Sequence, residues 1–154
     1  MREDFAAYAG QACILIVRSR ATSHSGNMAW QVPGTTVVRV KRIYDPPKKD
    51  DGVRVLVDRL WPRGLVKDKA RIDLWLRDIA PSDALRKWFA HDHNKWAAFQ
   101  KKYREELKAK KELLRQIKRL EKGSGVVTLL YGARDEKHNQ AVALGSLLKR
   151  LPRP

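Results

Sequence analysis

An almost uniformly apolar segment that ends in charge, Val53–Arg59, constrains the fold of this chain more than any other feature. A strand without regular polar alternation is typical of the centre of a sheet, where other elements cover both of its faces. The sequence Asp-Arg-Leu-Trp-Pro-Arg-Gly begins at Asp58, where such a strand should end and a loop begin. In open α/β sheets, ligands bind beyond the carboxyl ends of the strands. The segment therefore predicts a buried sheet and a candidate site at its edge.

Three other segments are expected to form strands. Thr36–Tyr44 alternates apolar and basic residues, which is typical of a half-exposed strand. Val126–Tyr131 has the strongest strand character in the chain. Ile72–Ile79 is also predicted to be a strand, with a short helix as the alternative, and Gly64–Lys69 is predicted to be a loop or a single helical turn.

Amphipathic patterns predict helices in the second half of the chain. Ser82 is a favourable N-cap for a short helix that follows it. Residues 95–122 carry helical apolar stripes and predict either two stacked helices or one kinked helix. Asn139–Leu151 predicts a closing helix. The predicted fold class is therefore α/β: a single domain with a mostly parallel sheet of about four strands, covered by amphipathic helices in two or three layers.

Residues 1–35 differ from the rest of the sequence. We expect them to form a partly disordered N-terminal extension ahead of a domain that spans residues 36–152; an upstream mis-start is one hypothesis for the origin of residues 1–27. An additional edge strand formed by Gln11–Val17 is the alternative. The apolar run at residues 12–17 is far shorter than the ~20 residues that a membrane helix needs, so no membrane segment is predicted.

The formal net charge of +16 bears on the partners of this protein. Such a charge favours polyanions, or it serves solubility alone. Lys95–Lys122 holds eleven lysines or arginines against four glutamates, and is either a solvated helix face or a surface for nucleic acid. The single cysteine, Cys13, excludes an internal disulfide and a Cys-rich zinc site, and a reducing cytoplasm is the expected compartment.

The first candidate site is the charged run that follows the central strand. Asp58 could act as a general base or could orient a ligand, while Arg59 and Arg63 could hold an anion between them. The alternative is that Asp58 and Arg59 pair with each other and fix the loop. Trp61 is either a stacking platform for a ring or an ordinary core residue.

A second candidate site follows the strand Val126–Tyr131. Arg134 and the start of the closing helix could bind an anion such as phosphate, and His138 could transfer a proton near neutral pH. Asp135 is a further catalytic candidate and Asn139 a hydrogen-bonding partner for the ligand. The alternative for Asp135 is a purely structural N-cap of the closing helix.

The sequence gives no strong indication of a metal site or a cofactor. His91 and His93 flank Asp92, but a single His-x-His pair is a weak metal signal, and a bracing role for His91 at the Trp88–Trp96 junction is favoured. Gly123-Ser-Gly125 precedes a strand, which is the wrong order for a phosphate-binding loop. We therefore predict no metal and no cofactor.

Several motifs give the chain a family resemblance: VKRIYDPP, VRVLVDRLWPRG, DLWLRDIAPS and VTLLYGARDEKHNQA. In continuous order over residues 38–150, the sequence resembles the YeaO-like family, part of the domain-of-unknown-function 488 group. The resemblance implies a small, cytoplasmic, bacterial α/β protein and supplies no established activity. Longer relatives carry a Cys-rich segment after the last strand, whereas this sequence has no cysteine there.

Two functional hypotheses follow. The first is an enzyme or ligand-binding domain for a phosphate-bearing small molecule or nucleotide, with its site where the two predicted strand ends meet. The second is a non-catalytic nucleic-acid-binding or regulatory protein that uses the basic residues Lys95–Lys122. The sequence predicts no oligomeric state.

Overall fold

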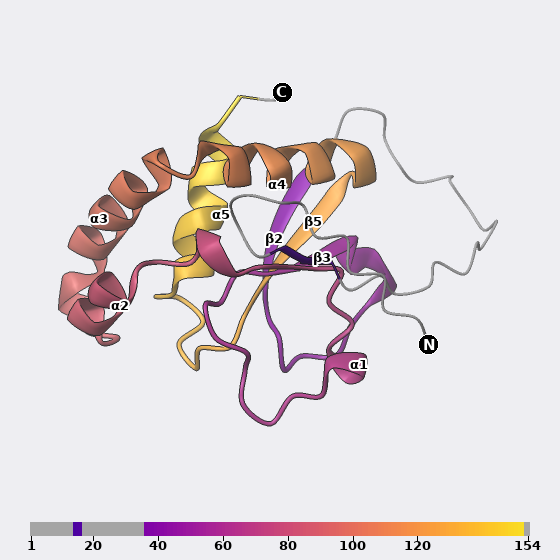
Figure 1. The fold of residues 1–154 in the computed structure, drawn as a ribbon, viewed down its shortest axis with the longest axis horizontal. Helices are drawn as coiled ribbons and strands as arrows, with labels where there is room; N and C mark the ends of the chain where they lie inside the picture. The colour runs from indigo at the N-terminus through magenta and orange to yellow at the C-terminus, as the bar shows by residue number, and fades with distance from the viewer. Residues whose placement is uncertain (1–13, 17–35, 153–154) are drawn as a thin grey trace.

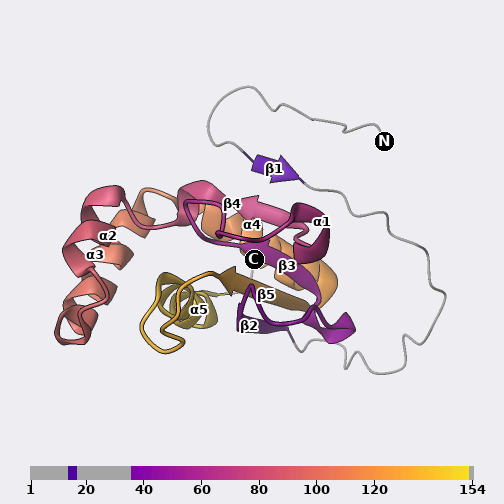
Figure 2. The same cartoon turned by 90° about the horizontal axis from the view of Figure 1, so that it is seen from below.

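The computed structural model describes residues 14–16 and 36–152, which form an α/β domain around one sheet (Figure 1). The strands lie in the order β1-β4-β3-β5-β2. The four strands β2 to β5 are mutually parallel, as the sequence predicts, and β1 pairs antiparallel with β4. Figure 2 shows the sheet with β1 and β2 at its two edges. The bounds are β1 Ile14–Ile16, β2 Val37–Arg42, β3 Val53–Leu56, β4 Leu74–Leu76 and β5 Val126–Tyr131.

The helices α2 to α5 are those that the sequence predicts, and α1 lies near the segment for which a loop or a single helical turn is expected. The α3–α4 segment consists of two helices rather than one kinked helix, and Tyr103 and Ile117 place their apolar faces in the core. Ser82 caps α2 by accepting a hydrogen bond from the backbone N–H of Leu85. The bounds are α1 Lys67–Ala70, α2 Asp83–Phe89, α3 Trp96–Lys108, α4 Lys111–Ser124 and α5 Gln140–Arg150, with short 3-10 turns η1 Lys49–Asp51, η2 Arg77–Ile79 and η3 His93–Lys95.

The two faces of the sheet are covered differently. Val55 and Leu129 point to the main core, which the helices α3, α4 and α5 complete. Because side chains alternate along a strand, Leu56 and Leu130 point the other way. They meet a smaller core that Ala70 of α1 helps to close. The sheet therefore has a helical layer on one face and the segment around α1 on the other.

The predicted strand Ile72–Ile79 is shorter than expected. Its central part is β4, but Arg77–Ile79 form the turn η2. The neighbouring strand β3 pairs with β4 only at Val55 and Leu56, and the chain leaves the sheet soon afterwards. β4 thus extends only one residue, Leu76, beyond its pairing with β3 before the chain turns.

The edge strand that was the alternative for the N-terminal segment is present at Ile14–Ile16, where β1 pairs with β4. The other residues of the predicted extension lie outside the described residues. In the part of the chain that the structure describes, no helix is long and apolar enough to cross a membrane.

Candidate functional site

Asp58 connects two neighbouring strand ends. It follows β3 by two residues, and its Oδ2 accepts a hydrogen bond from the backbone N–H of Gly132, directly after β5, at 2.8 Å. Its Oδ1 accepts a second hydrogen bond from the side-chain amide of Gln140, the first residue of α5. Burial raises the pKa of Asp58 to about 6, although these two hydrogen bonds favour the charged form. Asp58 is thus a carboxylate of perturbed acidity at the carboxyl edge of the sheet.

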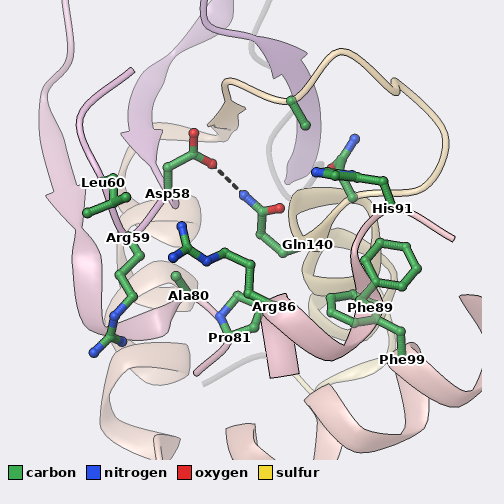
Figure 3. A pocket seen from close by; sticks show the side chains of 12 residues that line it. Asp58, Arg59, Leu60, Ala80, Pro81, Arg86, Phe89, His91, Phe99 and Gln140 are labelled. Atoms are coloured by element: carbon green, nitrogen blue, oxygen red, sulfur yellow. Dashed lines mark hydrogen bonds between the residues drawn. The ribbon is translucent and has the colours of Figure 1, made fainter. Parts of the chain in front are cut away.

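A cavity of about 190 Å³ opens beside Asp58 (Figure 3). Its walls come from the segments that follow three adjacent parallel strands, β3, β4 and β5, and from helices α2 and α3. This is the position at which open α/β sheets bind ligands. We call it the strand-end cavity; its lining consists of Asp58, Arg59, Leu60, Ala80, Pro81, Arg86, Phe89, His91, Phe99, Ala133, Asn139 and Gln140.

Two arginines supply positive charge to the strand-end cavity. Arg86 extends from α2 toward the side where Asp58 and Gln140 meet, while Arg59 points away from Asp58 (Figure 3). Both guanidinium groups face Asp83, which lies 3.2 Å from Arg86 and 3.6 Å from Arg59. Arg59 therefore pairs with Asp83 and not with Asp58 in the ion pairs of the described residues.

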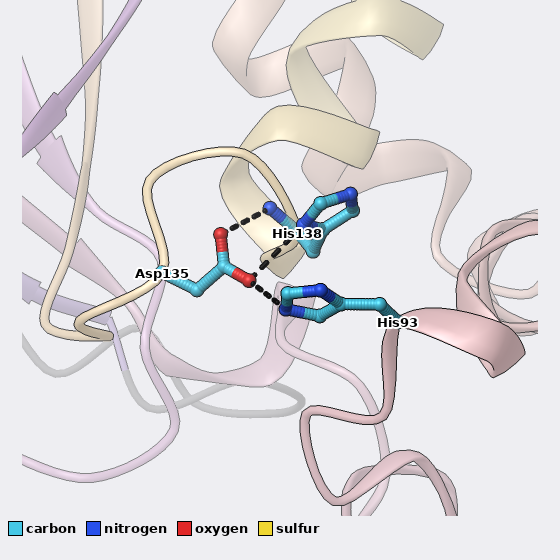
Figure 4. A group of neighbouring side chains, drawn as sticks. All are labelled: His93, Asp135 and His138. Carbon is cyan, nitrogen blue, oxygen red and sulfur yellow. Dashed lines mark hydrogen bonds and ion pairs between the residues drawn. The ribbon is translucent and has the colours of Figure 1, made fainter.

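His138 and Asp135 belong to a second, neighbouring group (Figure 4). Asp135 Oδ2 lies 2.7 Å from Nε2 of His93 and 3.0 Å from Nδ1 of His138. The two imidazole rings stack, with their centroids 4.3 Å apart. Hydrogen bonds from the backbone N–H of Lys137, above all, and of His138 lower the pKa of Asp135 below its usual range. We call these three residues the His93–Asp135–His138 cluster.

The N-cap of the closing helix is Asn139. Its side-chain oxygen accepts a hydrogen bond from the backbone N–H of Val142, and its amide group donates to the backbone carbonyl of Asp135. Asp135 is therefore not the N-cap of this helix, as the structural alternative expected. It closes the turn before the helix by accepting hydrogen bonds from the N–H groups of Lys137 and His138. Asn139 is 1% exposed and still contributes to the cavity lining.

Three other candidate residues lie outside the lining of the strand-end cavity. Trp61 packs against the smaller core, contacts Trp75 edge-on at 5.5 Å and donates a hydrogen bond to the carbonyl of Leu65. Arg63 and Arg134 are exposed. The structure thus brings Asp58, Arg59 and Asn139 together, groups Asp135 with His138, and leaves the other three apart.

Sequence reasoning missed several lining residues. Arg86 and Gln140 carried no recognisable signal, because each stands inside or at the start of an amphipathic helix. The sequence favours His91 as a brace at the Trp88–Trp96 junction and only weakly as a metal ligand. In the structure His91 lines the strand-end cavity, while His93 faces Asp135.

Part of the basic segment Lys95–Lys122 is paired or anchored in the described residues. Lys118 is buried beside Glu121 at 2.7 Å, and Lys110 donates to the carbonyl of Ala80. Two other features remain on the surface: Lys95 and Lys102 lie over the ring of Trp88, at 5.2 and 5.1 Å from its centroid. Trp88 is 37% exposed, so this aromatic group is accessible.

Comparison with known proteins identifies one matching family and several uncharacterized bacterial relatives. Residues 37–152 match the family described as "Inactive DUF488-N3 subclade". The chain is 41% identical over 113 residues to the uncharacterized protein Rv3073c of Mycobacterium tuberculosis (strain ATCC 25618 / H37Rv), covering 73% of this chain and 94% of that protein. It is 38% identical over 114 residues to the uncharacterized protein YeaO of Escherichia coli (strain K12), covering 74% and 98%. No solved structure gives a significant match.

Proposed function

This chain belongs to the YeaO-like DUF488 family, and from that premise we propose that it is a non-catalytic domain that binds a phosphate-bearing small molecule in the strand-end cavity. The observation that carries the proposal is the presence of Arg59 and Arg86 in one cavity at the carboxyl edge of a parallel sheet. The proposed compartment is the bacterial cytoplasm, which fits the single cysteine of the chain and its bacterial relatives.

The ion pairs of the two arginines are of a kind that an anion can replace. The side chains of Arg86 and Asp83 are 48% and 55% exposed, and exposed pairs contribute only about 0.2–1 kcal/mol each. A phosphate group that enters the cavity offers more acceptor oxygens than Asp83 and can bind a guanidinium group bidentately. His91, on the same lining, offers a further hydrogen-bond donor.

The size and walls of the strand-end cavity restrict the ligand. A volume of about 190 Å³ is below the ~300–1,000 Å³ of pockets that enclose drug-sized molecules. The cavity therefore suits a phosphate group and a few neighbouring atoms, and the base of a nucleotide would remain outside. Phe89, Phe99 and Pro81 provide an apolar wall for those neighbouring atoms.

Binding rather than catalysis is favoured by the engagement of Asp58. Each of its oxygens accepts a hydrogen bond from the protein, which holds the carboxylate against Gly132 and Gln140 in a structural role. The word "inactive" in the description of the matching family supports the same choice. The enzyme alternative relies on the raised pKa of Asp58, which is typical of functional carboxylates.

The test is a calorimetric titration of the full chain with inorganic phosphate and with glycerol 3-phosphate, at matched ionic strength. We expect Arg59→Gln and Arg86→Gln to weaken binding by about tenfold or more each, since each loses a hydrogen bond to a charged group. Arg115→Gln, which removes an exposed arginine paired with Glu112 on α4, is the matched control and should bind as the unmodified chain does. Equal affinity in all variants, or no response beyond that to chloride, would remove the proposal. Turnover of a phosphate ester by the unmodified chain and its loss in Asp58→Asn would favour the enzyme alternative instead.

A second candidate function is the binding of single-stranded nucleic acid around Trp88. An accessible tryptophan flanked by Lys95 and Lys102 can stack on a base while the lysines contact phosphates. We expect affinity for a short RNA oligonucleotide to fall steeply with salt and to drop in Trp88→Ala. A flat salt dependence would exclude this candidate.

A further inference from the structure

We infer that His93, Asp135 and His138 form a binding site for one divalent transition-metal ion of the zinc type. The His93–Asp135–His138 cluster offers one ligand atom from each side chain, and these three atoms lie within 4.8 Å of one another. His93 comes from η3, while Asp135 and His138 come from the loop between β5 and α5. The bound ion would join two loops that are more than 40 residues apart in the sequence. This inference is independent of whether the strand-end cavity binds phosphate.

The distances in the cluster are close to those that a metal requires. Bonds of about 2.0–2.1 Å in a tetrahedral site place neighbouring ligand atoms about 3.3 Å apart. Asp135 Oδ2 lies 2.7 Å from His93 Nε2 and 3.0 Å from His138 Nδ1. Side-chain rotations that lengthen these two separations by about 0.6 and 0.3 Å would therefore bring them to the coordinating value.

The side chains are already oriented for coordination. Asp135 Oδ1 accepts hydrogen bonds from the backbone N–H groups of Lys137 and His138, at 2.9 and 3.0 Å, which leaves Oδ2 for an ion. The ring of His138 packs against that of His93 on one side and meets the ring of Trp96 edge-on at 5.3 Å. Such surroundings fix the direction of metal ligands and contribute to affinity.

The types of ligand atom select the class of ion. Two imidazole nitrogens and one carboxylate oxygen suit zinc and neighbouring transition metals, whereas magnesium and calcium prefer oxygen ligands throughout. Three protein ligands leave a position open for water or an anion, as in catalytic zinc sites. The side chain of His93 is 64% exposed, so an ion can reach the cluster from solvent.

The metal-free cluster has a different hydrogen arrangement, and this gives the inference its sharpest test. Without an ion, His93 Nε2 and His138 Nδ1 both face the same oxygen, so each should carry a hydrogen. An ion would displace both hydrogens, and the neutral rings would carry them on His93 Nδ1 and His138 Nε2 instead. Long-range ¹H–¹⁵N correlation spectra distinguish the two tautomers of each ring.

The experiment uses the untagged full chain with Cys13→Ser, which removes the single competing thiol. After treatment with a chelator, the protein is titrated with zinc chloride in a calorimeter and by the NMR measurement above. We expect one ion per chain, an increase in the thermal unfolding temperature and exchange of the tautomers of His93 and His138. His93→Ala, His138→Ala and Asp135→Asn should each weaken binding by about tenfold or more.

His91→Ala is the matched control, because His91 is close in sequence to His93 and lies outside the cluster. It should bind zinc as the parent chain does. Circular dichroism before titration separates a loss of ligands from a loss of folding, and Asp135→Glu, which keeps a carboxylate, should retain part of the affinity. Absence of zinc binding in the parent chain, or unchanged tautomers at His93 and His138, would overturn the inference.

Discussion

Two aspartates at strand ends show how local surroundings set acidity at the scale of single residues. Burial raises the pKa of Asp58 to about 6, and its two hydrogen bonds offset only part of that effect. Backbone N–H groups lower the pKa of Asp135, which is less enclosed. Both residues were catalytic candidates on the sequence alone, where their positions after β3 and β5 looked equivalent. Because of their neighbours, Asp58 loses its proton at a higher pH than an ordinary aspartate, whereas Asp135 stays charged to a lower pH.

The raised pKa of Asp58 predicts a specific pH dependence of stability. Below the unfolded-state pKa, near 3.8, Asp58 is neutral in both states and its contribution to the free energy of unfolding is fully present. As the pH rises toward the folded-state value of about 6, the unfolded chain ionises first and this contribution is lost. The loss is at most about 3 kcal/mol. Asp58→Asn should abolish it, because asparagine does not ionise.

Urea unfolding of both proteins at a series of pH values measures this effect. The difference between the two free energies of unfolding should change between about pH 4 and pH 6 and stay constant above that range. Other titrating groups contribute equally to both proteins, so they cancel in the difference. Parallel curves throughout would mean that Asp58 keeps an ordinary pKa in the folded protein.

Gly132 permits Asp58 to approach the backbone closely, and its replacement should be costly. A Cβ at this position would lie 2.9 Å from Asp58 Oδ2 and 3.5 Å from Pro62 Cβ. Gly132→Ala should therefore separate the carboxylate from its backbone donor and lower the free energy of unfolding by about 1–3 kcal/mol. Gly123→Ala is the control: nothing lies within 4 Å of its Cβ, and alanine in a helix should be neutral or stabilising. Equal effects of the two variants in urea unfolding would contradict this account.

At the scale of elements, the end of α2 carries unusual backbone geometry. Ala90 and His91 have φ values of +45° and +58°, in the left-handed region that glycine favours. Ala90 is the C-cap of α2, and its N–H closes the helix on the carbonyl of Arg86. Because this turn aims His91 at the strand-end cavity, the strain lies next to the candidate site.

Ala90→Gly should relieve this strain. A left-handed conformation costs a non-glycine residue about 1–2 kcal/mol, and the extra flexibility of glycine in the unfolded chain offsets part of the gain. We expect a net stabilisation of up to about 1 kcal/mol. Ala84→Gly, within α2, should instead destabilise by a similar amount. Thermal unfolding of the two variants checks the opposite signs; destabilisation by Ala90→Gly would show that the turn is not strained.

Much of this fold could be predicted from the sequence, element by element. Hydrophobic periodicity located the four parallel strands and the long helices, because each buries a continuous apolar face. The end of β4 could not be predicted, since it depends on how far β3 accompanies it. Likewise, Asn139 rather than Asp135 caps α5, because the intervening residues form a closed turn.

Only part of the candidate site could be predicted from the sequence. The charged run after β3 identified Asp58 and Arg59, because it follows directly on a buried strand. Their partners Arg86 and Gln140 come from helices whose placement depends on the order of the strands in the sheet. His93 meets Asp135 for the same reason: two loops approach each other only after the domain has folded. The spacing of residues along the sequence cannot predict contacts between such distant segments.

At the scale of the whole molecule, the net charge of +16 predicts a response to salt. Like charges repel one another in the compact state, and added ions screen this repulsion. Raising sodium chloride from about 20 to about 300 mM should raise the thermal unfolding temperature by roughly 2–4 °C, equivalent to about 1 kcal/mol. Arg104→Glu and Lys111→Glu, which reverse two exposed charges, should reduce the response. A decrease in unfolding temperature with salt would show that the surface ion pairs outweigh the repulsion.

The position of β5 has a consequence for the order in which the chain can assemble. β2 and β3 follow each other in sequence but do not lie side by side; β5 separates them and pairs with both. In the described part of the chain, β2 has no other strand partner. During synthesis, β2 therefore cannot pair with its neighbour until residues 126–131 have been made. Until then, the unpaired backbone groups of β2 and of one edge of β3 can form hydrogen bonds with other chains. Such late closure between distant segments is slow, so nascent copies of this protein should depend on chaperones more than its small size suggests.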